Sequence, residues 1–345
     1  MILFRADGNS AVGSGHVMRC LSIADAAKQL GEKCIFVTAA DDFEAHITSR
    51  GHEVQVLGTD YTDMEAEDMP AILETYKPSV LFVDSYFVTD KYLSSLQEYC
   101  KDHEIMLAYL DDVLAFPYPC DILINYNIYG KEEDYINLYE GLQIPRLLLG
   151  TTYAPLRIEF QDRTTRVARR EADSVLVSTG GADAEHLGVE LLKRAMQYPY
   201  TFHFIVGAMN PDKDKIRELA AAADNIVLHE GVTSMAPLMK ACDVAISAAG
   251  STLYELCATQ TPTITYILAD NQIPGAEAFS AKEVMRNCGD VRILGREKLA
   301  EKLLEEAEAL MNNYEDRVQI SQNMQIIVDG NGAGRMIKKV FSKKA

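Results

Sequence analysis

The chain opens at residues 1–20 with MILFRADGNSAVGSGHVMRC, a short apolar run that leads through a glycine-rich turn into a helical pattern. Ile2–Arg5 predicts a β-strand, and apolar residues recur at helical spacing over Val17–Leu30. Gly31 then stands where a glycine commonly ends a helix. A strand joined by a turn to a helix begins a βαβ unit, so this stretch predicts an α/β fold.

The same alternation of strands and helices continues through the first half of the chain. Thr89 is a predicted N-cap of a helix that ends near Lys101. Further strands are predicted at Cys34–Thr38, Val54–Leu57, Val80–Asp84, Ile105–Asp111 and Ile122–Asn125. Repeated βαβ units predict a parallel sheet that is covered by helices on both faces.

A charged stretch that lacks long apolar runs, TTYAPLRIEFQDRTTRVARREAD at residues 151–173, interrupts this rhythm. We therefore predict a first α/β domain over residues 1–155 and a second over residues 156–345, whose last helix could pack back on the first. In the second part, strands are predicted at Ser174–Ser178, Phe202–Val206, Ile226–Leu228, Val244–Ser247, Thr263–Ile267 and Val291–Leu294, and late helices at Lys298–Met311 and Gln319–Val328. Because parallel sheets bind ligands beyond the carboxyl ends of their strands, we expect the two sheets to face a central cleft.

Composition excludes several classes of protein. Hydrophobic residues make up 48% of the chain and charged residues 24%, as in ordinary globular proteins. The 51 acidic and 33 basic residues give a net charge of -18, which repels nucleic acids and anionic membranes, and no apolar run is long enough for membrane insertion. The seven dispersed cysteines contain no CxxC pair, and the N-terminus is too short of apolar residues for a signal peptide. We therefore expect reduced thiols and a cytoplasmic protein, whose oligomeric state the sequence does not indicate.

The first glycine loop is a candidate ligand site. Gly13, Ser14 and Gly15 precede the predicted helix, and His16 stands at its start. Closely spaced glycines let the backbone approach a ligand, and a helix N-terminus supplies free N–H donors. A tight turn with a capping histidine is the alternative. The loop matches a dinucleotide-binding fingerprint only loosely, because Met18 stands where that pattern has Gly or Ala, and the chain has no GxxxxGK[ST] phosphate loop.

Two glycine loops of the second part predict a nucleotide site. Gly180 and Gly181 follow the first strand there, and SAAGSTLYE at residues 247–255 places Gly250 and Ser251 about one helical turn before Glu255. Loop amides would bind a diphosphate, and the carboxylate would accept hydrogen bonds from ribose hydroxyls. The alternative is a helix cap at Ser251 and a solvated carboxylate at Glu255, but the repetition of such loops favours the nucleotide.

Polar residues also follow other predicted strands. Asp84, Ser85 and Tyr86 follow one, the pair at residues 111 and 112 follows the next, and Asn271 follows a strand of the second part. The paired aspartates suggest a divalent metal, but nothing places a further oxygen ligand beside them. The chain contains no HExxH and no GxSxG motif. We therefore expect no metal and no cofactor.

Several motifs, in order along nearly the whole chain, resemble the UDP-2,4-diacetamido-2,4,6-trideoxy-β-L-altropyranose hydrolases of pseudaminic acid biosynthesis. They are FRADGNSAVGSGHVMRC, VDSYFV, LDD, CDILINYN, YAPLRIEF, VSTGGAD, SAAGSTLYELCATQTPTI, LADNQ and VDGNGAGR, of which GSGHVMRC and YAPLRIEF are the more specific. That family looks like a trimmed relative of the GT-B glycosyltransferases. The resemblance implies a GT-B-like fold with two Rossmann-like domains.

The resemblance also implies roles for particular residues. It implies an inverting hydrolase that releases UDP from a UDP-sugar, with His16 as the catalytic base. Residues that match its binding positions are Gly15, Tyr86, Arg157, Asn271 and Glu255. Ser85 stands where the family's motif has room for a histidine, and we assign it no role. A GT-B glycosyltransferase that uses a UDP-sugar donor and a non-catalytic nucleotide-sugar-binding module are the alternatives.

Overall fold

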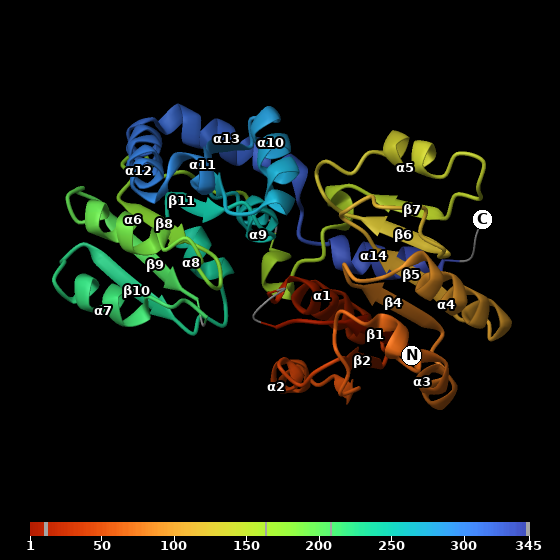
Figure 1. The fold of residues 1–345 in the computed structure, drawn as a ribbon. Helices are drawn as coiled ribbons and strands as arrows, with labels where there is room; N and C mark the ends of the chain where they lie inside the picture. Colours follow the sequence, from red (N-terminus) through yellow and green to blue (C-terminus); the bar gives the residue numbers. More distant parts are fainter. Residues whose placement is uncertain (10–12, 163, 208, 343–345) are drawn as a thin grey trace. The chain divides into compact units, whose positions relative to one another are not determined.

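The computed structural model describes residues 1–9, 13–162, 164–207 and 209–342 and forms two compact units (Figure 1). Unit 1 contains residues 1–158 and 331–345, and unit 2 contains residues 159–330. The chain therefore passes from one unit to the other twice. The division lies a few residues beyond the predicted boundary at residue 155, and it assigns the last helix to the first unit.

Unit 1 is built on a seven-stranded sheet in the order β3-β2-β1-β4-β5-β6-β7, in which every neighbouring pair is parallel. The strands are β1 (Ile2–Ala6), β2 (Cys34–Thr38), β3 (Glu53–Val56), β4 (Val80–Asp84), β5 (Met106–Leu110), β6 (Ile122–Asn125) and β7 (Arg146–Leu149). Alternate residues of β1 belong to different clusters of the core: Ile2 and Phe4 pack in one, and Leu3 packs in the other. The prediction of a parallel sheet that is buried on both faces is confirmed.

The helices of unit 1 supply the cover for both faces. They are α1 (Gly15–Gln29), α2 (Glu44–Ser49), α3 (Met69–Tyr76), α4 (Asp90–Asp102), α5 (Glu132–Leu138) and α14 (Gly332–Phe341), with short 3-10 turns η1 (Met64–Ala66), η2 (Thr151–Tyr153) and η3 (Ile158–Phe160), the last of which spans the division between the units. Two predicted boundaries are confirmed. Gly31 adopts a φ of 85°, and the Thr89 hydroxyl accepts a hydrogen bond from the amide of Tyr92 at 3.0 Å.

The last helix, α14, packs on α1 and contributes Met336, Ile337 and Val340 to the core of unit 1. The first residue of this helix, Gly332, has to be a glycine, because a Cβ atom there would lie 2.2 Å from the Ala154 carbonyl oxygen. At its other end, the Arg146 guanidinium donates to backbone carbonyls, including that of Ser342 at 3.0 Å. A cation at a helix C-terminus is favourable because the last carbonyls carry partial negative charge.

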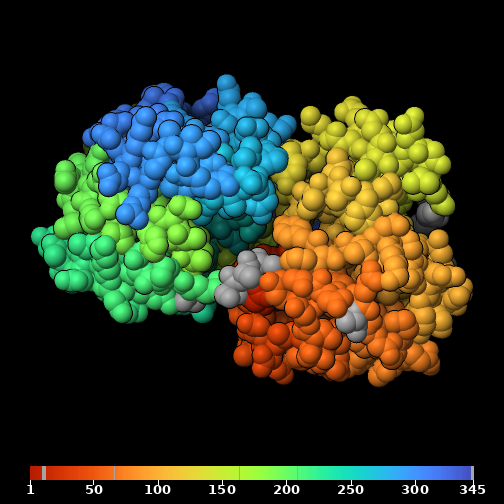
Figure 2. Space-filling model, in the orientation of Figure 1, coloured from red at the N-terminus to blue at the C-terminus, as the bar shows by residue number. Residues whose placement is uncertain are grey.

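Unit 2 is built on a six-stranded sheet in the order β10-β9-β8-β11-β12-β13, which is also parallel throughout. Its strands are β8 (Ser174–Ser178), β9 (Thr201–Val206), β10 (Ile226–Glu230), β11 (Val244–Ala248), β12 (Thr263–Ile267) and β13 (Met285–Asp290). Its helices are α6 (Leu187–Ala195), α7 (Lys213–Ala221), α8 (Ala236–Ala241), α9 (Thr252–Ala258), α10 (Ile273–Ala281), α11 (Val291–Leu294), α12 (Arg296–Asn312) and α13 (Tyr314–Ile327), with the 3-10 turn η4 (Asp270–Gln272). In the space-filling view, the blue residues of α12 and α13 cover one part of this unit (Figure 2).

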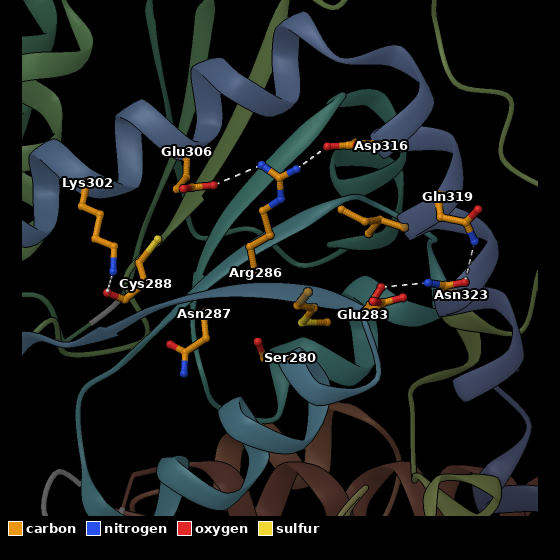
Figure 3. Close-up of a pocket in the computed structure, with 12 residues that line it drawn as sticks. Ser280, Glu283, Arg286, Asn287, Cys288, Lys302, Glu306, Asp316, Gln319 and Asn323 are labelled. Carbon is orange, nitrogen blue, oxygen red and sulfur yellow. Dashed lines mark hydrogen bonds and ion pairs between the residues drawn. The ribbon is translucent and has the colours of Figure 1, made fainter.

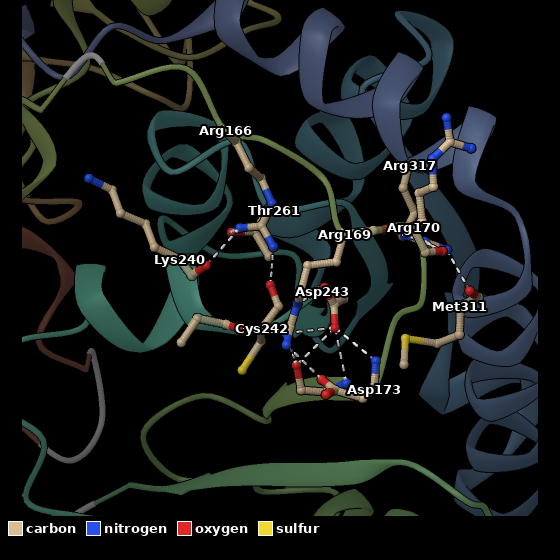
Figure 4. Close-up of polar contacts among 12 residues, drawn as sticks. Arg166, Arg169, Arg170, Asp173, Lys240, Cys242, Asp243, Thr261, Met311 and Arg317 are labelled. Atoms are coloured by element: carbon tan, nitrogen blue, oxygen red, sulfur yellow. Dashed lines mark hydrogen bonds and ion pairs between the residues drawn. The ribbon is translucent and has the colours of Figure 1, made fainter.

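Charged side chains fasten the stretch before β8 to the amino-terminal edge of this sheet (Figure 4). Arg169 pairs with the buried carboxylate of Asp243, which also accepts hydrogen bonds from the backbone amides of Asp173 and Ser174. The Arg317 guanidinium donates to carbonyls of Leu310, Met311, Arg169 and Arg170. The charge that marked this stretch in the sequence is therefore used largely in contacts within unit 2.

Two local predictions are wrong or incomplete. Val291–Leu294 is the short helix α11, not a strand, because Asp290 caps it by accepting the Arg292 amide at 2.8 Å. The edge strand β13 instead consists of the polar sequence MRNCGD. The strand β7 was not predicted.

Candidate functional site

Both sheets reverse their strand order at their first strand. In unit 1, β2 and β3 follow β1 on one side, and β4 continues on the other. In unit 2, β8 and β11 flank the corresponding point. Ligands of open parallel sheets bind at such switch points, beyond the carboxyl ends of the strands. The first glycine loop follows β1, and the loops at Gly180 and Gly250 follow β8 and β11, so the three predicted glycine loops lie at these points within each unit.

His16 is the second residue of α1 and is only 7% exposed. Its Nε2 lies 4.0 Å from Oδ1 of Asp84, the last residue of β4, and its ring meets the Tyr86 ring edge-on at 4.4 Å. The neighbouring strands β1 and β4 therefore bring the glycine loop and the VDSY motif together. Gly15 leaves open space where a side chain would begin, so this end of α1 is accessible to a ligand.

Arg19 holds the carboxylate beside the histidine. It stands three residues after His16 on α1 and donates to both oxygens of Asp84. Burial by itself would raise the pKa of the fully buried Asp84, but the cations Arg19 and, when protonated, His16 outweigh it and lower that pKa below its ordinary value. Asp84 is therefore an anion, fixed in position by a charge-assisted bidentate pair.

Burial lowers the pKa of His16 below its ordinary value of 6.5, and the positive charge of Arg19 acts in the same direction. The carboxylate of Asp84 opposes this shift without reversing it. The imidazole is consequently neutral at pH 7 and able to accept a proton.

Two further polar residues complete the cluster in unit 1. Asp112, just after β5, accepts hydrogen bonds from Arg19 at 2.9 Å and from the Tyr86 hydroxyl at 3.1 Å. Tyr126, just after β6, accepts one from Arg19 at 3.3 Å. The sequence drew attention to Asp112 only as a possible metal ligand and did not single out Arg19. The spacing of three residues between His16 and Arg19, which puts both on one face of a helix, was the available signal.

In unit 2, the backbone of the first glycine pair is exposed at the end of β8. Gly180 has a φ of 83°, a conformation that favours glycine, and Gly181 packs closely on Gly207. The next acidic residue, Asp183, is buried and accepts the amides of Leu187 and Gly188 at the start of α6. Asp183 is thus a structural cap, and the glycine amides remain the candidate ligand donors.

The second glycine loop lies beside the first, because β11 pairs with β8. A side chain at Gly250 would enter open space, and Ser251 is exposed and makes no side-chain capping hydrogen bond. Glu255 is half-buried on α9, and Asn271 is exposed in η4 beyond β12. The helix-cap alternative for the Ser251 side chain is therefore not what the structure shows.

Arg157 is half-buried and belongs to unit 1, where its charge lowers the pKa of His46 after the larger effects of burial and of Arg50. The predicted residues other than Arg157 thus form one cluster in unit 1 around His16 and Tyr86, and a set of neighbouring loops in unit 2, whereas Arg157 lies near His46. The expectation of a single cleft lined by both stays a prediction.

Residues 174–329, nearly all of unit 2, match the sequence model of the glycosyltransferase family 28 C-terminal domain. Three solved structures resemble the whole chain: a MurG from Acinetobacter baumannii (TM-score 0.65, 12% identity, 98% of each chain), the calicheamicin glycosyltransferase CalG4 (0.64, 13%, 100% of this chain and 99% of that one), and the Streptomyces glycosyltransferase SsfS6 complexed with thymidine diphosphate (0.57, 13%, 98% and 99%). The fold is GT-B-like. This confirms the predicted fold class of two parallel α/β sheets.

Curated relatives carry the name that the motifs suggested. A Campylobacter jejuni protein named UDP-2,4-diacetamido-2,4,6-trideoxy-beta-L-altropyranose hydrolase is 25% identical over 74% of this chain and 86% of its own length. A Helicobacter pylori protein named for this hydrolase and for pseudaminic acid cytidylyltransferase is 24% identical over 79% of this chain. The Bacillus subtilis spore coat polysaccharide biosynthesis protein SpsG is 25% identical over 96% of this chain and 95% of its own length. The names of the Campylobacter and Helicobacter proteins confirm the resemblance.

The matches also differ in extent. This chain spans 46% of the length of the Helicobacter protein and 55% of that of an uncharacterised Methanocaldococcus jannaschii relative. The GT-B-like chain contains, in its described residues, no group of three or more His, Cys, Asp or Glu side chains arranged for a metal ion. No helix among the described residues has the length and apolar character needed to cross a membrane.

A pocket of about 570 Å³ lies elsewhere in the GT-B-like chain, along β13 in unit 2 (Figure 3). Arg286 lines it and is already paired with Glu306 at 3.1 Å and with Asp316, while Lys302 donates to the Cys288 carbonyl at 2.8 Å. The Arg286 guanidinium and the Lys302 ammonium group are therefore already engaged within the protein. Because the pocket borders the side of the edge strand and not the carboxyl end of the sheet, we do not assign it to the candidate site.

Proposed function

We propose that this protein hydrolyses a UDP-linked 2,4-diacetamido-2,4,6-trideoxy-β-L-altropyranose at the anomeric carbon, with inversion, as a step of pseudaminic acid biosynthesis. The observation that carries the proposal is a buried neutral histidine, His16, held beside the anionic Asp84 at the switch point of unit 1. The names of the Campylobacter and Helicobacter relatives supply the sugar and the reaction. In line with that pathway, we propose a cytoplasmic location.

In the proposed mechanism, His16 accepts a proton from a water molecule, whose oxygen bonds to the anomeric carbon. The bond between that carbon and the diphosphate oxygen breaks, and UDP leaves with the bonding electrons. UDP is a stable anion, so no acid is needed to protonate it, unlike the alkoxide leaving group of an ordinary glycosidase. The carboxylate of Asp84 stabilises the imidazolium that forms, and Arg19 keeps that carboxylate in place.

The charges around His16 support the proposal that the two units bind different parts of the substrate. Three carboxylates, Asp7, Asp84 and Asp112, and the cation Arg19 act on His16. Because Asp7 is already paired with Arg5 at 2.6 Å, Asp84 and Asp112 share Arg19, which leaves an excess of negative charge. Such a site suits the uncharged sugar better than a diphosphate. We propose that the amides of Gly180, Gly181 and Gly250 and the Ser251 hydroxyl bind the diphosphate in unit 2, where they lie on neighbouring strands.

The remaining roles rest mainly on the resemblance. We propose that Glu255 accepts hydrogen bonds from the ribose hydroxyls and that Arg157 and Asn271 bind the substrate. Tyr86 and the amide of Gly15 would contact the sugar near the reacting carbon, in keeping with the contact between the Tyr86 and His16 rings.

The test is incubation of the purified protein with a panel of UDP-sugars and no acceptor, in ¹⁸O-labelled water. We expect UDP release from the diacetamido-trideoxy altrose donor, with the label on the sugar and the inverted anomer in early NMR spectra. Label on UDP would mean attack at phosphorus and would exclude the proposed mechanism.

A GT-B glycosyltransferase is the second candidate, because residues 174–329 match a glycosyltransferase family domain. It predicts UDP release only after an acceptor is added, so the same panel separates the two activities. Binding of UDP-sugars without turnover under either condition would instead indicate a non-catalytic binding module.

A further inference from the structure

Asp112 uses only one of its two carboxylate oxygens. Its Oδ2 accepts both printed hydrogen bonds, from Arg19 at 2.9 Å and from the Tyr86 hydroxyl at 3.1 Å. Within the described part of the chain, no residue donates a hydrogen bond to its Oδ1. The side chain is only 14% exposed. A carboxylate offers about four acceptor positions, so this nearly buried anion keeps half of its capacity for another molecule.

The free oxygen is also held still. Arg19, which binds Asp112 through Nη1, is fixed by its bidentate pair with Asp84. Tyr86, the second partner of Asp112, has its ring against His16. Asp112 therefore belongs to the cluster around the proposed base, and the position of its Oδ1 is set before any ligand arrives. Such preorganisation lowers the cost of binding.

The surroundings select the kind of donor. The site already carries an excess of carboxylates, so a phosphate is disfavoured, and a neutral N–H or O–H group fits an anionic acceptor. Two exposed side chains with apolar surface are its neighbours: Val113, which follows Asp112 in the chain, is 57% exposed, and Tyr86, whose hydroxyl binds Asp112, is 41% exposed. A hydroxyl group of the sugar would use only the carboxylate oxygen. An acetamido group would use the carboxylate and the apolar surface, because its N–H donates to the carboxylate while its methyl group contacts the apolar side chains.

We infer that Asp112 is a specificity-determining residue whose Oδ1 accepts the N–H of an acetamido substituent of the sugar, with Val113 and Tyr86 beside the methyl group. This inference rests on the proposed function, since it assumes that the sugar lies at the unit 1 cluster. It adds a reason why a diacetamido sugar would be preferred to a plain hexose.

The test compares wild type and Asp112→Asn on three probes: UDP-2,4-diacetamido-2,4,6-trideoxy-altropyranose and its two analogues in which one acetamido group is replaced by hydroxyl. We expect Asp112→Asn to lower kcat/KM for the diacetamido sugar about 10- to 100-fold, mostly through KM, the effect of losing a charged hydrogen bond. One analogue should lower wild-type kcat/KM to a similar degree, and with that analogue Asp112→Asn should make little further difference. Inhibition by UDP should stay within about twofold, because we place the diphosphate at the glycine loops of unit 2, away from the lost hydrogen bond.

One control variant and one further test variant complete the comparison. Tyr126→Phe removes another hydroxyl bound to Arg19 without touching Asp112, and it should leave the preference among the three sugars unchanged. Val113→Ser alters an exposed side chain, so the fold is not strained, and it should reduce the preference for acetamido over hydroxyl about threefold to tenfold, as expected for one methyl-sized contact.

An equal loss on all three sugars, or an equal loss of UDP inhibition, would assign Asp112 a structural role and overturn the inference. If wild type releases UDP from none of the sugars, the proposed function fails separately. Calorimetric binding of the same three sugars to both proteins then decides the inference, and equal affinities would overturn it.

Discussion

His16 and Asp84 illustrate how one pair of residues sets the pH range of the proposed reaction. Burial lowers the pKa of His16 below 6.5, and the base must be neutral to accept a proton. Activity should therefore be constant above about pH 7 and fall as pH decreases through a value below 6.5.

His16→Asn should still bind UDP-sugar but lose about 10²- to 10⁴-fold in kcat, the usual contribution of a positioned base. Profiles of kcat/KM against pH and calorimetric binding measure both effects.

Asp84→Asn should shift this acidic limb. The charge of Asp84 raises the pKa of His16, so its removal should lower that pKa further and move the limb to lower pH, while kcat falls because the imidazolium loses its partner. Cys20→Ala is the matched control, since its thiol contacts Asp84 at 3.5 Å but carries no charge. If the acidic limb of the kcat/KM profile lies at the same pH in Asp84→Asn and in wild type, Asp84 does not influence the protonation of His16.

Glu255 allows the nucleotide site to be tested independently of the chemistry. If its carboxylate accepts the ribose hydroxyls, Glu255→Ala should weaken UDP binding by about 1.5–3 kcal/mol, the range for charge-assisted hydrogen bonds. Because the side chain is only half-buried, the fold should persist, which circular dichroism can verify. Calorimetry that finds the same UDP affinity in both proteins would remove Glu255 from the site.

Among the elements, the edge of unit 2 that holds Asp243 should set part of the acid stability. Burial alone would raise the pKa of Asp243, but the amide of Asp173 and the contacts with Arg169 and Ser174 lower it below 3.8. The stabilisation is therefore present above about pH 3.8 and is lost as pH falls through the lower folded-state value. Asp243→Asn should lower the free energy of unfolding by about 1–3 kcal/mol at pH 7. In the variant, the free energy of unfolding should also fall less steeply as the pH decreases below about 4.

Urea unfolding between pH 2.5 and 7 would measure this difference. Asp173→Asn is a suitable control, because the Asp173 side chain is mostly exposed and pairs only with the partly exposed Arg169. Equal pH dependence in wild type and Asp243→Asn would show that this carboxylate does not contribute to acid stability.

The elements also show where sequence patterns lose their power. Buried central strands such as β4 read as continuous apolar runs, and they were predicted within a residue or two. The edge strand β13 consists of buried and partly buried residues and reads MRNCGD, which has neither apolar continuity nor a helical period. The apolar VRIL that follows looked like a strand, but the local cap at Asp290 made it a helix. Local side-chain hydrogen bonds outweighed the pattern there.

The candidate site was predictable to a similar degree. Glycines, His16 and the polar residues after strands are marked by their position along the chain. Arg19 and the roles of Asp84 and Asp112 are not, because they depend on which strands become neighbours. Only the order β1-β4-β5-β6 places the ends of these strands side by side. The sequence alone therefore indicates candidate site residues, but not which of them contact one another in the folded sheet.

At the scale of the whole molecule, the chain repeats one topology twice and then returns to its beginning. Both sheets extend first to one side and then to the other of their first strand, so each has one switch point. The segment VDGNGAGR makes the return. Gly330 has a φ of 75° and would, with a side chain, meet the Phe160 carbonyl oxygen at 2.0 Å, and Gly332 is restricted in the same way by Ala154. Close backbone packing explains these late glycines without a ligand.

The return of α14 predicts that the C-terminal helix stabilises unit 1 and not the unit that precedes it in sequence. Met336 is fully buried among the apolar residues that surround α1 and β1. Met336→Ala should destabilise unit 1 by about 2–5 kcal/mol, because it removes buried apolar atoms and leaves a cavity. Hydrogen exchange should accordingly rise in β1 and α1, while β8 and β11 keep their protection. Lys338→Ala, on the exposed face of the same helix, should change neither set. Equal loss of protection in both units would mean that they unfold together, and increased exchange confined to β8 and β11 would assign α14 to unit 2.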